Sequence, residues 1–519
     1  MKPNQTSPPS TDPKLAVRED FVPFAGIASA LAVSLLITLG GCASYAGIAP
    51  VAQRVTPTAL GLGLGPEAGA TALIAIEADW WRGFADPTLN DLVERALSAH
   101  PSLKVAQARI KRAEAAISSA QAADGLQING SLDATRQLFS ENSIYPQPLG
   151  GSVRTIATAQ FGAAYEFDFF GRNRAVIEAA VGTQRAAQAD LQAARIVLAS
   201  TVARSYVQLG RLFEQREVTV RTLKQRDETL QLIKQRVQSG LDTNVELRQG
   251  EAALPESRQL IEQLDEQIML TRHALAALTA QAPRALDALV APLRSLQSIV
   301  LPAALPADLL GRRADISAAR WRIEAAASDI TSAKAQFYPN INLTAFAGLS
   351  SIGLNRLIGS GSEQWGVGPA LRLPIFDSGR LRANLRGKTA DLDAAIESYN
   401  TVVLDAVHDA ADQIGSLRAI ALQQAQQASA QTAMESAHDL AGQRFKAGLS
   451  TYLIVLNAES NVLNQRRQAV DLRARALDLQ IALIRALGGG YRADLIAENA
   501  PEGANAGVTD SVSARPIKH

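Results

Sequence analysis

The sequence has very few of the residues from which reactive or metal-binding sites are built. A single cysteine, Cys42, stands in 519 residues, so no intramolecular disulfide can form. The five histidines lie far apart, without the spacing of a metal site. No Ser-His-Asp or Cys-His set can be assembled from recognisable motifs. We therefore expect neither an enzyme nor a bound metal or cofactor.

Excess charge and aromatic side chains are also scarce. Lysine and arginine together number 51 against 50 acidic residues, a net charge of +1, which gives the chain no general attraction to nucleic acid. Aromatic residues make up 5% and charged residues 19%, whereas hydrophobic residues make up 47%. A chain of this length fits two to four domains or one elongated architecture, with cores built mainly from Ala, Leu, Val and Ile.

Proline is missing from two long stretches. The chain holds 22 prolines, yet none lies between Pro148 and Pro255 or between Pro374 and Pro501. Proline inside a helix costs about 3 kcal/mol, so its absence predicts uninterrupted helices. Residues 172–239 as one helix would be about 100 Å long, which favours a tall, hollow or fibrous shape. In the second stretch a row of residues at seven-residue spacing predicts coiled-coil packing: Ile396, Val403, Ala410 and Leu417.

The N-terminus has the layout of a secretory signal. Basic residues precede an apolar run over 21–38, and small residues lead to Cys42. Leu-Gly-Gly-Cys resembles the bacterial lipobox, in which the cysteine is acylated and becomes the mature N-terminus. We expect 1–41 to be a lipoprotein signal peptide and 42–78 an acylated N-terminal segment. A retained membrane-spanning anchor is the alternative.

The rest of the chain reads as a duplication. Residues 235–243 (QRVQSGLDT) return as 443–451 (QRFKAGLST), a shift of 208. Each copy opens with an Ala-rich helical stretch (about 88–123 and 306–336), then has two alternating segments, a very long helix, a Gly-centred break and a second long helix. We place the copies at 79–290 and 304–490, followed by a C-terminal tail at 491–519.

The alternating segments predict four strands of about ten residues, arranged as two hairpins. They centre on 128–134, 159–169, 341–345 and 365–376, and each has one apolar face. An ordinary small sheet half-covered by helices is one interpretation. The secretion signal, strand length and aromatic face favour strands that cross a membrane. Four strands cannot close a barrel, and open edges are not tolerated in lipid, so three copies would pool twelve strands.

Several of these motifs together resemble one known family. Asp79-Trp80-Trp81, the run Phe84-Ala85-Asp86-Pro87-Thr88-Leu89, and Leu92-Val93 resemble the opening signature of the TolC-like outer-membrane efflux factors. The lipobox and the Gly-Leu turns resemble its lipoprotein (NodT-type) branch. The resemblance implies an α+β membrane protein: a homotrimer with a 12-stranded outer-membrane β-barrel, four strands per chain, continuous with a long periplasmic α-helical barrel of twelve helices.

The resemblance also implies roles for particular residues. The two helical hairpin tips lie at the periplasmic end and contact an adaptor protein; they match Gly240, Leu241, Asp242 and Thr243 in the first copy and Gly448, Leu449, Ser450 and Thr451 in the second. The glycines can take the left-handed conformation that ends a helix. The entrance constriction of the family matches Leu453 and Asn457. An acid is usual at the second position, so Asn457 would remove three charges from a trimeric ring. A plain turn and a packed helix face are the structural alternatives.

The function implied is passive conduction. We expect an outer-membrane channel lipoprotein, lipid-anchored at Cys42, that receives small toxic molecules through a periplasmic adaptor (membrane fusion) protein from an inner-membrane resistance-nodulation-division (RND) pump. One alternative is a duct for type I protein or polysaccharide export. Another is a periplasmic coiled-coil scaffold without a pore. The sequence does not indicate which compounds are transported.

Overall fold

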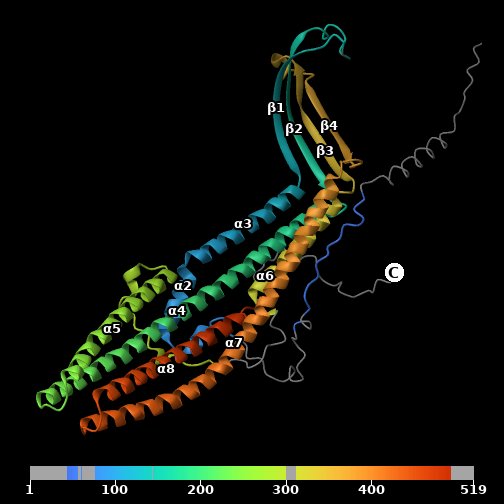
Figure 1. Cartoon of the computed structure of the whole chain (residues 1–519). Coiled ribbons are helices and arrows are strands. Elements are labelled where there is room, and N and C mark those ends of the chain that lie inside the picture. The colour runs from blue at the N-terminus through green and yellow to red at the C-terminus, as the bar shows by residue number, and fades with distance from the viewer. Residues whose placement is uncertain (1–43, 57–59, 61–75, 143, 300–310, 493–519) are drawn as a thin grey trace, which may run out of the picture.

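The computed structural model describes residues 44–56, 60, 76–142, 144–299 and 311–492. The chain is elongated, with a sheet at one end and two helical hairpin tips at the other (Figure 1). The predicted signal peptide, Cys42 and nearly all of the predicted tail lie outside the described residues. The elements are η2 Trp80–Phe84, α2 Pro87–Ala99, α3 Pro101–Asp124, β1 Gln127–Leu138, β2 Val153–Phe167, α4 Arg172–Gln238, α5 Asn244–Leu278, η3 Pro283–Leu286, η4 Leu293–Ser295, α6 Ala314–Ala335, β3 Asn340–Ile352, η6 Leu354–Arg356, β4 Glu363–Arg372, α7 Arg380–Lys446 and α8 Tyr452–Ala486.

The long helices agree with the proline-free stretches and with the duplication. Helices α4 and α7 each contain 67 residues, and α5 and α8 each contain 35. At 1.5 Å per residue, α4 and α7 are each about 100 Å long. In the seven-residue row of α7, Ile396, Val403 and Ala410 are buried. The two copies therefore have the same backbone plan.

The first predicted helical stretch, about 88–123, consists of two helices. Helix α2 ends at Ala99 and α3 begins at Pro101, with His100 extended between them. Pro101 has no N–H to donate and disfavours a helical conformation at His100, so it can only begin a new helix. In the second copy the described helix, α6, begins at Ala314.

The four strands form one antiparallel sheet in the order β1-β2-β3-β4. The two predicted hairpins are thus joined through β2 and β3. Strands β1 and β2 extend beyond the predicted segments, from Gln127↔Ala164 to Leu138↔Val153. Strand β4 ends at Arg372 instead of continuing to 376, because Pro374 cannot donate to a strand ladder.

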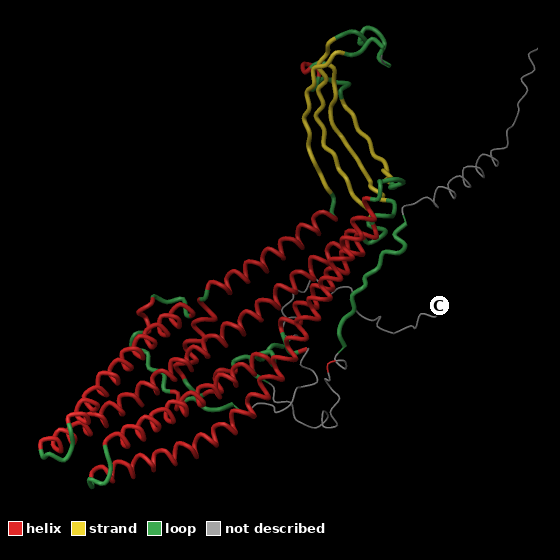
Figure 2. Tube along the Cα trace, viewed as in Figure 1, coloured by secondary structure: helices red, strands yellow, loops and turns green. Residues whose placement is uncertain are grey.

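The register places apolar and polar side chains on opposite faces of the sheet. Residues paired across antiparallel strands share a face. Gly130, Phe161, Ala347 and Trp365 form one such row. The next row, on the opposite face, contains Ser131, Gln160, Gly348 and Gln364. The apolar face is open in the single chain: the side chain of Trp365 is 78% exposed. The sheet projects from the end of the helices, and within the described residues no helix lies over it (Figure 2). An ordinary sheet half-covered by helices is thus excluded.

The helices form a layer four columns wide. In the half nearest the sheet, α4 packs against α3 and α6; in the other half it packs against α5 and α8, and α7 packs against α6 and then α8. The first of the four columns contains α3 near the sheet and α5 near the tips, and the second is α4. The third contains α6 near the sheet and α8 near the tips, and the fourth is α7. None of the described helices has an apolar run long enough to cross a membrane.

The main core lies where the layer meets the N-terminal elements. Trp80, Trp81 and Phe84 pack with α2 and with apolar residues of α4, α5 and α8. Asp86 caps α2 by accepting hydrogen bonds from the backbone N–H groups of Thr88 and Leu89, and it also accepts one from the Tyr206 hydroxyl at 3.0 Å. Burial beside this carboxylate raises the pKa of Tyr206. The segment from Trp80 to Asp86 thus packs against the middle of α4 and is hydrogen-bonded to it.

Candidate functional site

The two hairpin tips reverse the chain with the same backbone geometry. Gly240 and Gly448 have φ angles of 72° and 77°, in the left-handed region. At the first tip the N–H of Leu241 donates to the carbonyl of Arg236 at 2.8 Å, and at the second tip the N–H of Leu449 donates to that of Arg444 at 2.8 Å. This is the Schellman ending of a helix, which favours glycine at the left-handed position.

The first tip is further fastened by side chains. The guanidinium of Arg236 donates to both carboxylate oxygens of Asp242, at 2.8 and 3.1 Å. Thr243 and Glu246 form a capping box at the start of α5. The hydrogen bond from the Thr243 side chain lowers the pKa of Glu246.

The second tip lacks these fastenings. Ser450 occupies the position of Asp242, and its hydroxyl oxygen is buried without a hydrogen-bond partner in the part of the chain that the structure describes. Thr451, which precedes α8, makes no side-chain capping bond. Arg444, the counterpart of Arg236, is exposed and makes no ion pair among the described residues. The second tip therefore depends mainly on its backbone geometry and on the residues that it packs against.

One arginine joins the two tips. Nη1 of Arg236 donates to the carbonyl of Phe445 at 3.2 Å, and the guanidinium lies 4.7 Å from the centre of the Phe445 ring. Ile233 of α4 packs in the same cluster as Phe445, Tyr452 and Val455. The first tip thus contacts the end of α7 directly.

The leucines of both tips and the two predicted constriction residues lie at the surface of the single chain. Leu241 is 66% exposed and Leu449 is 70% exposed, so each tip presents an apolar side chain. Leu453 and Asn457 are one turn apart on α8 and are both exposed. Neither is buried between α7 and α8, so the packed-helix alternative does not hold for them within one chain.

A pair of charged residues that the sequence analysis did not single out is buried above the tips. Nε of Arg226 on α4 donates to Glu459 on α8 at 3.1 Å, and the two side chains are 8% and 10% exposed. A sequence signal was present, because Glu459 interrupts the buried row Tyr452, Val455 and Val462 of α8. A charged residue within an apolar helical row indicates a partner across the interface.

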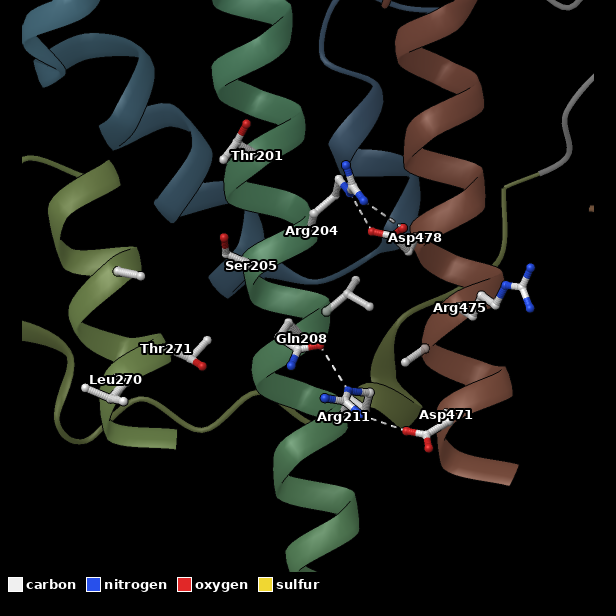
Figure 3. Close-up of a pocket in the computed structure, with 13 residues that line it drawn as sticks. Thr201, Arg204, Ser205, Gln208, Arg211, Leu270, Thr271, Asp471, Arg475 and Asp478 are labelled. Atoms are coloured by element: carbon white, nitrogen blue, oxygen red, sulfur yellow. Dashed lines mark hydrogen bonds and ion pairs between the residues drawn. The ribbon is translucent and has the colours of Figure 1, made fainter. Parts of the chain in front are cut away.

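A groove that contains several charged side chains runs along one face of the helical layer, between α5, α4 and α8 (Figure 3). Its cavity measures about 750 Å³. Arg204 pairs with Asp478 at 2.6 and 3.0 Å, and Arg211 pairs with Asp471 at 2.8 Å. The opposite face of α4 carries the apolar core residues, among them Val202, Tyr206 and Leu209. The face with the groove thus carries several charged side chains, although Val207 and Ala474 of the core also reach it.

The N-terminal segment 44–56 runs along the helices close to the sheet (Figure 1). The Tyr45 ring packs edge-on against Phe337 at 5.5 Å, just before β3. Further along, the backbone N–H groups of Val51 and Ala52 donate to Asp393 on α7. These contacts place Ser44, two residues after Cys42, at the foot of the sheet.

These features define a class of protein: a subunit of a membrane channel in which a sheet with one apolar face continues into a layer of long helices. Comparisons agree. The sequence model described as "Outer membrane efflux protein" matches residues 92–281 and 305–489. The chain therefore belongs to the outer membrane efflux protein family.

Individual relatives cover most of the chain. A fusaric acid resistance protein, FusA of Burkholderia cepacia, is 37% identical over 69% of this chain and 68% of its own length. The putative multidrug resistance outer membrane protein MdtQ of Escherichia coli K12 is 32% identical over 88% and 97%. The crystal structure of the outer membrane protein VceC from Vibrio cholerae superposes with a TM-score of 0.75 at 36% identity, over 80% of this chain and all of that one.

These findings settle the coarser predictions. The TolC-like family and its fold class are confirmed, since the solved neighbours are outer-membrane channels with four strands per chain and a helical barrel. The chain is an outer-membrane efflux channel protein that extends into the periplasm. Because the family transports solutes without transforming them, the prediction that the chain is not an enzyme is confirmed.

Proposed function

We propose that three copies of this chain form the outer-membrane duct of a tripartite efflux system, which passively conducts small toxic molecules from an inner-membrane RND pump to the exterior. The observation that supports a trimer is that the sheet and the helical layer have their open edges in corresponding places. The sheet ends at β1 and β4, and the helical layer ends at α3 with α5 and at α7. Strand β1 follows α3 and β4 leads into α7, so each open edge is continuous from sheet to helices.

Lipid makes closure necessary. Within the described part of a single chain, the outward N–H and C=O groups of β1 and β4 have no partner strand, and each unsatisfied group costs several kcal/mol in a bilayer. In a ring, β4 of one copy runs antiparallel to β1 of the next, because the strands alternate in direction. Twelve strands enclose more space than an eight-stranded barrel, whose interior side chains fill.

The two faces of the sheet suit lipid and water. The apolar face with Phe161 and Trp365 would meet the acyl chains, and the face with Gln160 and Gln364 would line the bore. The amide of Gln364 donates to the Gln160 side chain at 3.3 Å across β3. The groove with Arg204 and Arg211 would continue this polar wall through the helical tunnel.

We propose that Cys42 carries the lipid anchor. The contacts of 44–56 support this, because they hold Ser44 at the foot of the sheet, near the level at which the strands would leave the membrane. Two or three acyl chains contribute about 0.8 kcal/mol per buried methylene, enough for stable anchoring. In this proposal 1–41 is removed, 42–78 links the anchor to the first copy (79–290), and the second copy (304–490) precedes the tail (491–519).

The hairpin tips would form the entrance. Leu241 and Leu449 are exposed apolar residues at the end farthest from the sheet, as contact with an adaptor requires. Leu453 and Asn457 lie one turn inside the second tip and would form the constriction. Asn457 brings no charge, so attraction of cations would not arise at this ring.

A deletion strain tests this function. The chain, expressed in a Gram-negative strain that lacks its own outer-membrane efflux duct but keeps a cognate adaptor and pump, should restore resistance to the compounds of that pump. Cys42→Ser should reduce the amount in the outer membrane. Normal assembly in the outer membrane without restored resistance would contradict small-molecule efflux and favour another export duty. Unchanged lipid labelling of Cys42→Ser would contradict the anchor.

A further inference from the structure

A cavity of about 520 Å³ lies where the sheet meets the long helices (Figure 1). The strands contribute Glu166 of β2, Asn340 and Asn342 of β3, and Arg372 of β4, all near the strand ends that adjoin the helices. Side chains alternate between the two faces of a sheet, so steps of two residues from the row with Gln160 place all four on the polar face. The cavity is therefore built on the face that the proposed bore exposes to water.

Two arginines line this cavity without a bonded partner in the described part of the chain. Arg372 ends β4 and Arg380 begins α7, and both are exposed. No side-chain hydrogen bond or ion pair among the described residues involves either guanidinium. Asp377 is near Arg380, but its carboxylate accepts hydrogen bonds from the backbone N–H groups of Gly379 and Leu381, at 3.0 and 2.8 Å. Both guanidinium groups can therefore bind an anion from solution.

The acidic residues that line the cavity are already engaged. Glu166 pairs with Arg172 at 3.0 Å, and Asp168 accepts a hydrogen bond at 2.9 Å from the backbone N–H of Arg174, at the start of α4. The lining has three arginines, at 172, 372 and 380, against these two acids, so each chain brings one net positive charge. A ring of three copies would bring three such charges, which attract anions.

Aromatic rings form another part of the lining. Phe170 and Tyr338 stack with their ring centres 4.6 Å apart and their planes inclined by 10°, and the two residues are 44% and 41% exposed. The Tyr338 hydroxyl shares a hydrogen bond of 3.3 Å with that of Tyr45, which helps to hold the ring in place. The side-chain oxygen of Asn340 is buried with no hydrogen-bond partner among the described residues, so a ligand that brings a donor would satisfy it.

We infer that this cavity is a transit site for small aromatic anions, carboxylates or sulfonates, at the junction of barrel and tunnel. Arg372 and Arg380 bind the acid group, because a guanidinium pairs with such oxygens through parallel hydrogen bonds. The exposed faces of Phe170 and Tyr338 contact the aromatic part. The inference rests on the proposed duct, since a transported molecule reaches the cavity only if the polar face lines the bore.

Weak binding is consistent with transport. Partly exposed ion pairs contribute little each, and a solute that is held too tightly would block the duct. The site therefore acts on selectivity: it raises the local concentration of aromatic anions relative to cations of the same shape. Three copies would place three such sites at one level of the duct.

Binding of a matched pair of probes tests the site. The purified full-length channel in lipid nanodiscs is titrated at pH 7.5 with 2-naphthoate or with 2-naphthylmethylamine, its cationic counterpart, and followed by saturation-transfer NMR with empty nanodiscs subtracted. The wild type should bind naphthoate about fivefold more tightly than the amine. Arg372→Gln with Arg380→Gln should weaken naphthoate binding about tenfold and leave the amine unaffected or bound more tightly. Equal binding of naphthoate by the wild type and this double variant would overturn the inference.

Single substitutions separate a local site from a general effect of charge. Arg154 pairs with Gln137 on the same polar face at the far end of β2, so Arg154→Gln removes an equal charge and should leave naphthoate binding unchanged. Glu166→Gln frees Arg172 and should strengthen naphthoate binding about threefold. Phe170→Leu removes one ring face and should weaken it about threefold. If Arg154→Gln weakens binding as much as the double variant does, the effect is long-range and the site is wrong.

Conductance distinguishes failure of this inference from failure of the proposed duct. In planar bilayers, naphthoate should reduce the potassium chloride current of the wild type and affect the double variant about tenfold less. If the protein binds naphthoate through its arginines but does not conduct, the site stands and the duct is wrong. If it conducts and the double variant responds to naphthoate as the wild type does, the duct stands and the site is wrong.

A lipid headgroup is the other anion that could occupy this cavity. Phospholipid that stays with the wild type through purification and is lost from the double variant, without any binding of naphthoate, would assign the arginines to lipid and overturn the inference. Should the double variant fail to assemble, Arg372→Gln and Glu166→Gln decide through their opposite effects on naphthoate binding.

Discussion

The two hairpin tips have the same backbone but different side-chain fastenings. Both end their long helix with a left-handed glycine and the same pair of backbone hydrogen bonds. Only the first tip has an arginine–aspartate pair and a capping box, and its Arg236 also reaches the end of α7. The two copies thus have the same turn, but the second tip is held by fewer side-chain hydrogen bonds than the first. We expect the second hairpin to move more readily when the entrance opens.

The largest expected effect comes from removing the fastening of the first tip. Arg236→Met leaves Asp242 without its arginine partner and removes one of the two hydrogen bonds that the Phe445 carbonyl accepts, at a cost of about 2 kcal/mol in local stability. Amides of residues 240–246 should then exchange with deuterium about 30-fold faster. The matched change Arg444→Met should have almost no effect at the second tip. Equal effects of the two substitutions would remove the difference between the tips.

Substitution of the two tip glycines tests the backbone turn that both tips have in common. A Cβ atom added at Gly240 or Gly448 meets nothing within 4 Å, so a substitution changes only the backbone preference. Gly240→Ala and Gly448→Ala should each cost about 1 kcal/mol, because non-glycine residues disfavour the left-handed region. Local exchange should rise by a similar factor, about fivefold, at both tips. A much larger effect at one tip would show that the backbones are not equivalent.

Transferring the carboxylate from the first tip to the second should reduce the difference. In Ser450→Asp the new side chain occupies the position of Asp242 and can pair with Arg444, which in the wild-type chain has no ion-pair partner among the residues that the structure covers. Exchange of amides 448–454 should slow by about threefold, as expected for a partly exposed pair. The same substitution in an Arg444→Met background should lose this protection. If protection persists there, the new aspartate acts as a helix cap and not through the arginine.

The smallest difference should appear only on acidification. The lowered pKa of Glu246 means that its capping bonds add stability above the ordinary glutamate pKa, and this stability is lost as the pH falls through the lowered value. The second tip has Ile454 at that position and so has no such titration. Exchange at the start of α5, corrected for its intrinsic pH dependence, should therefore speed up below about pH 4.5, while the start of α8 is unaffected. Glu246→Gln should abolish the difference in pH response.

Much of the fold could be predicted because its signals are periodic. The proline-free stretches predicted the two 67-residue helices, and the alternation over 128–134 predicted both faces of the first part of β1. The break at Pro101 was readable from local chemistry but was overlooked. The order of strands across the sheet required the structure, because alternation defines faces and not neighbours.

The site was predictable only where a motif recurs in the chain. The two Gly-Leu turns were found by their repetition, and the structure places them at one end of the molecule. The contacts that distinguish the tips join residues far apart in sequence: Arg226 with Glu459, and Arg236 with Phe445. Such contacts depend on how α4 packs against α7 and α8, which no local pattern encodes. The capping box at Thr243 was a local signal that could have been recognised.

Closure of the sheet and the helical layer by neighbouring copies is the central claim, and the number of chains per particle tests it most directly. Native mass spectrometry of the protein extracted in a mild detergent should give one species of three chains and no monomer. A single chain that stays monodisperse in water without detergent would contradict the account.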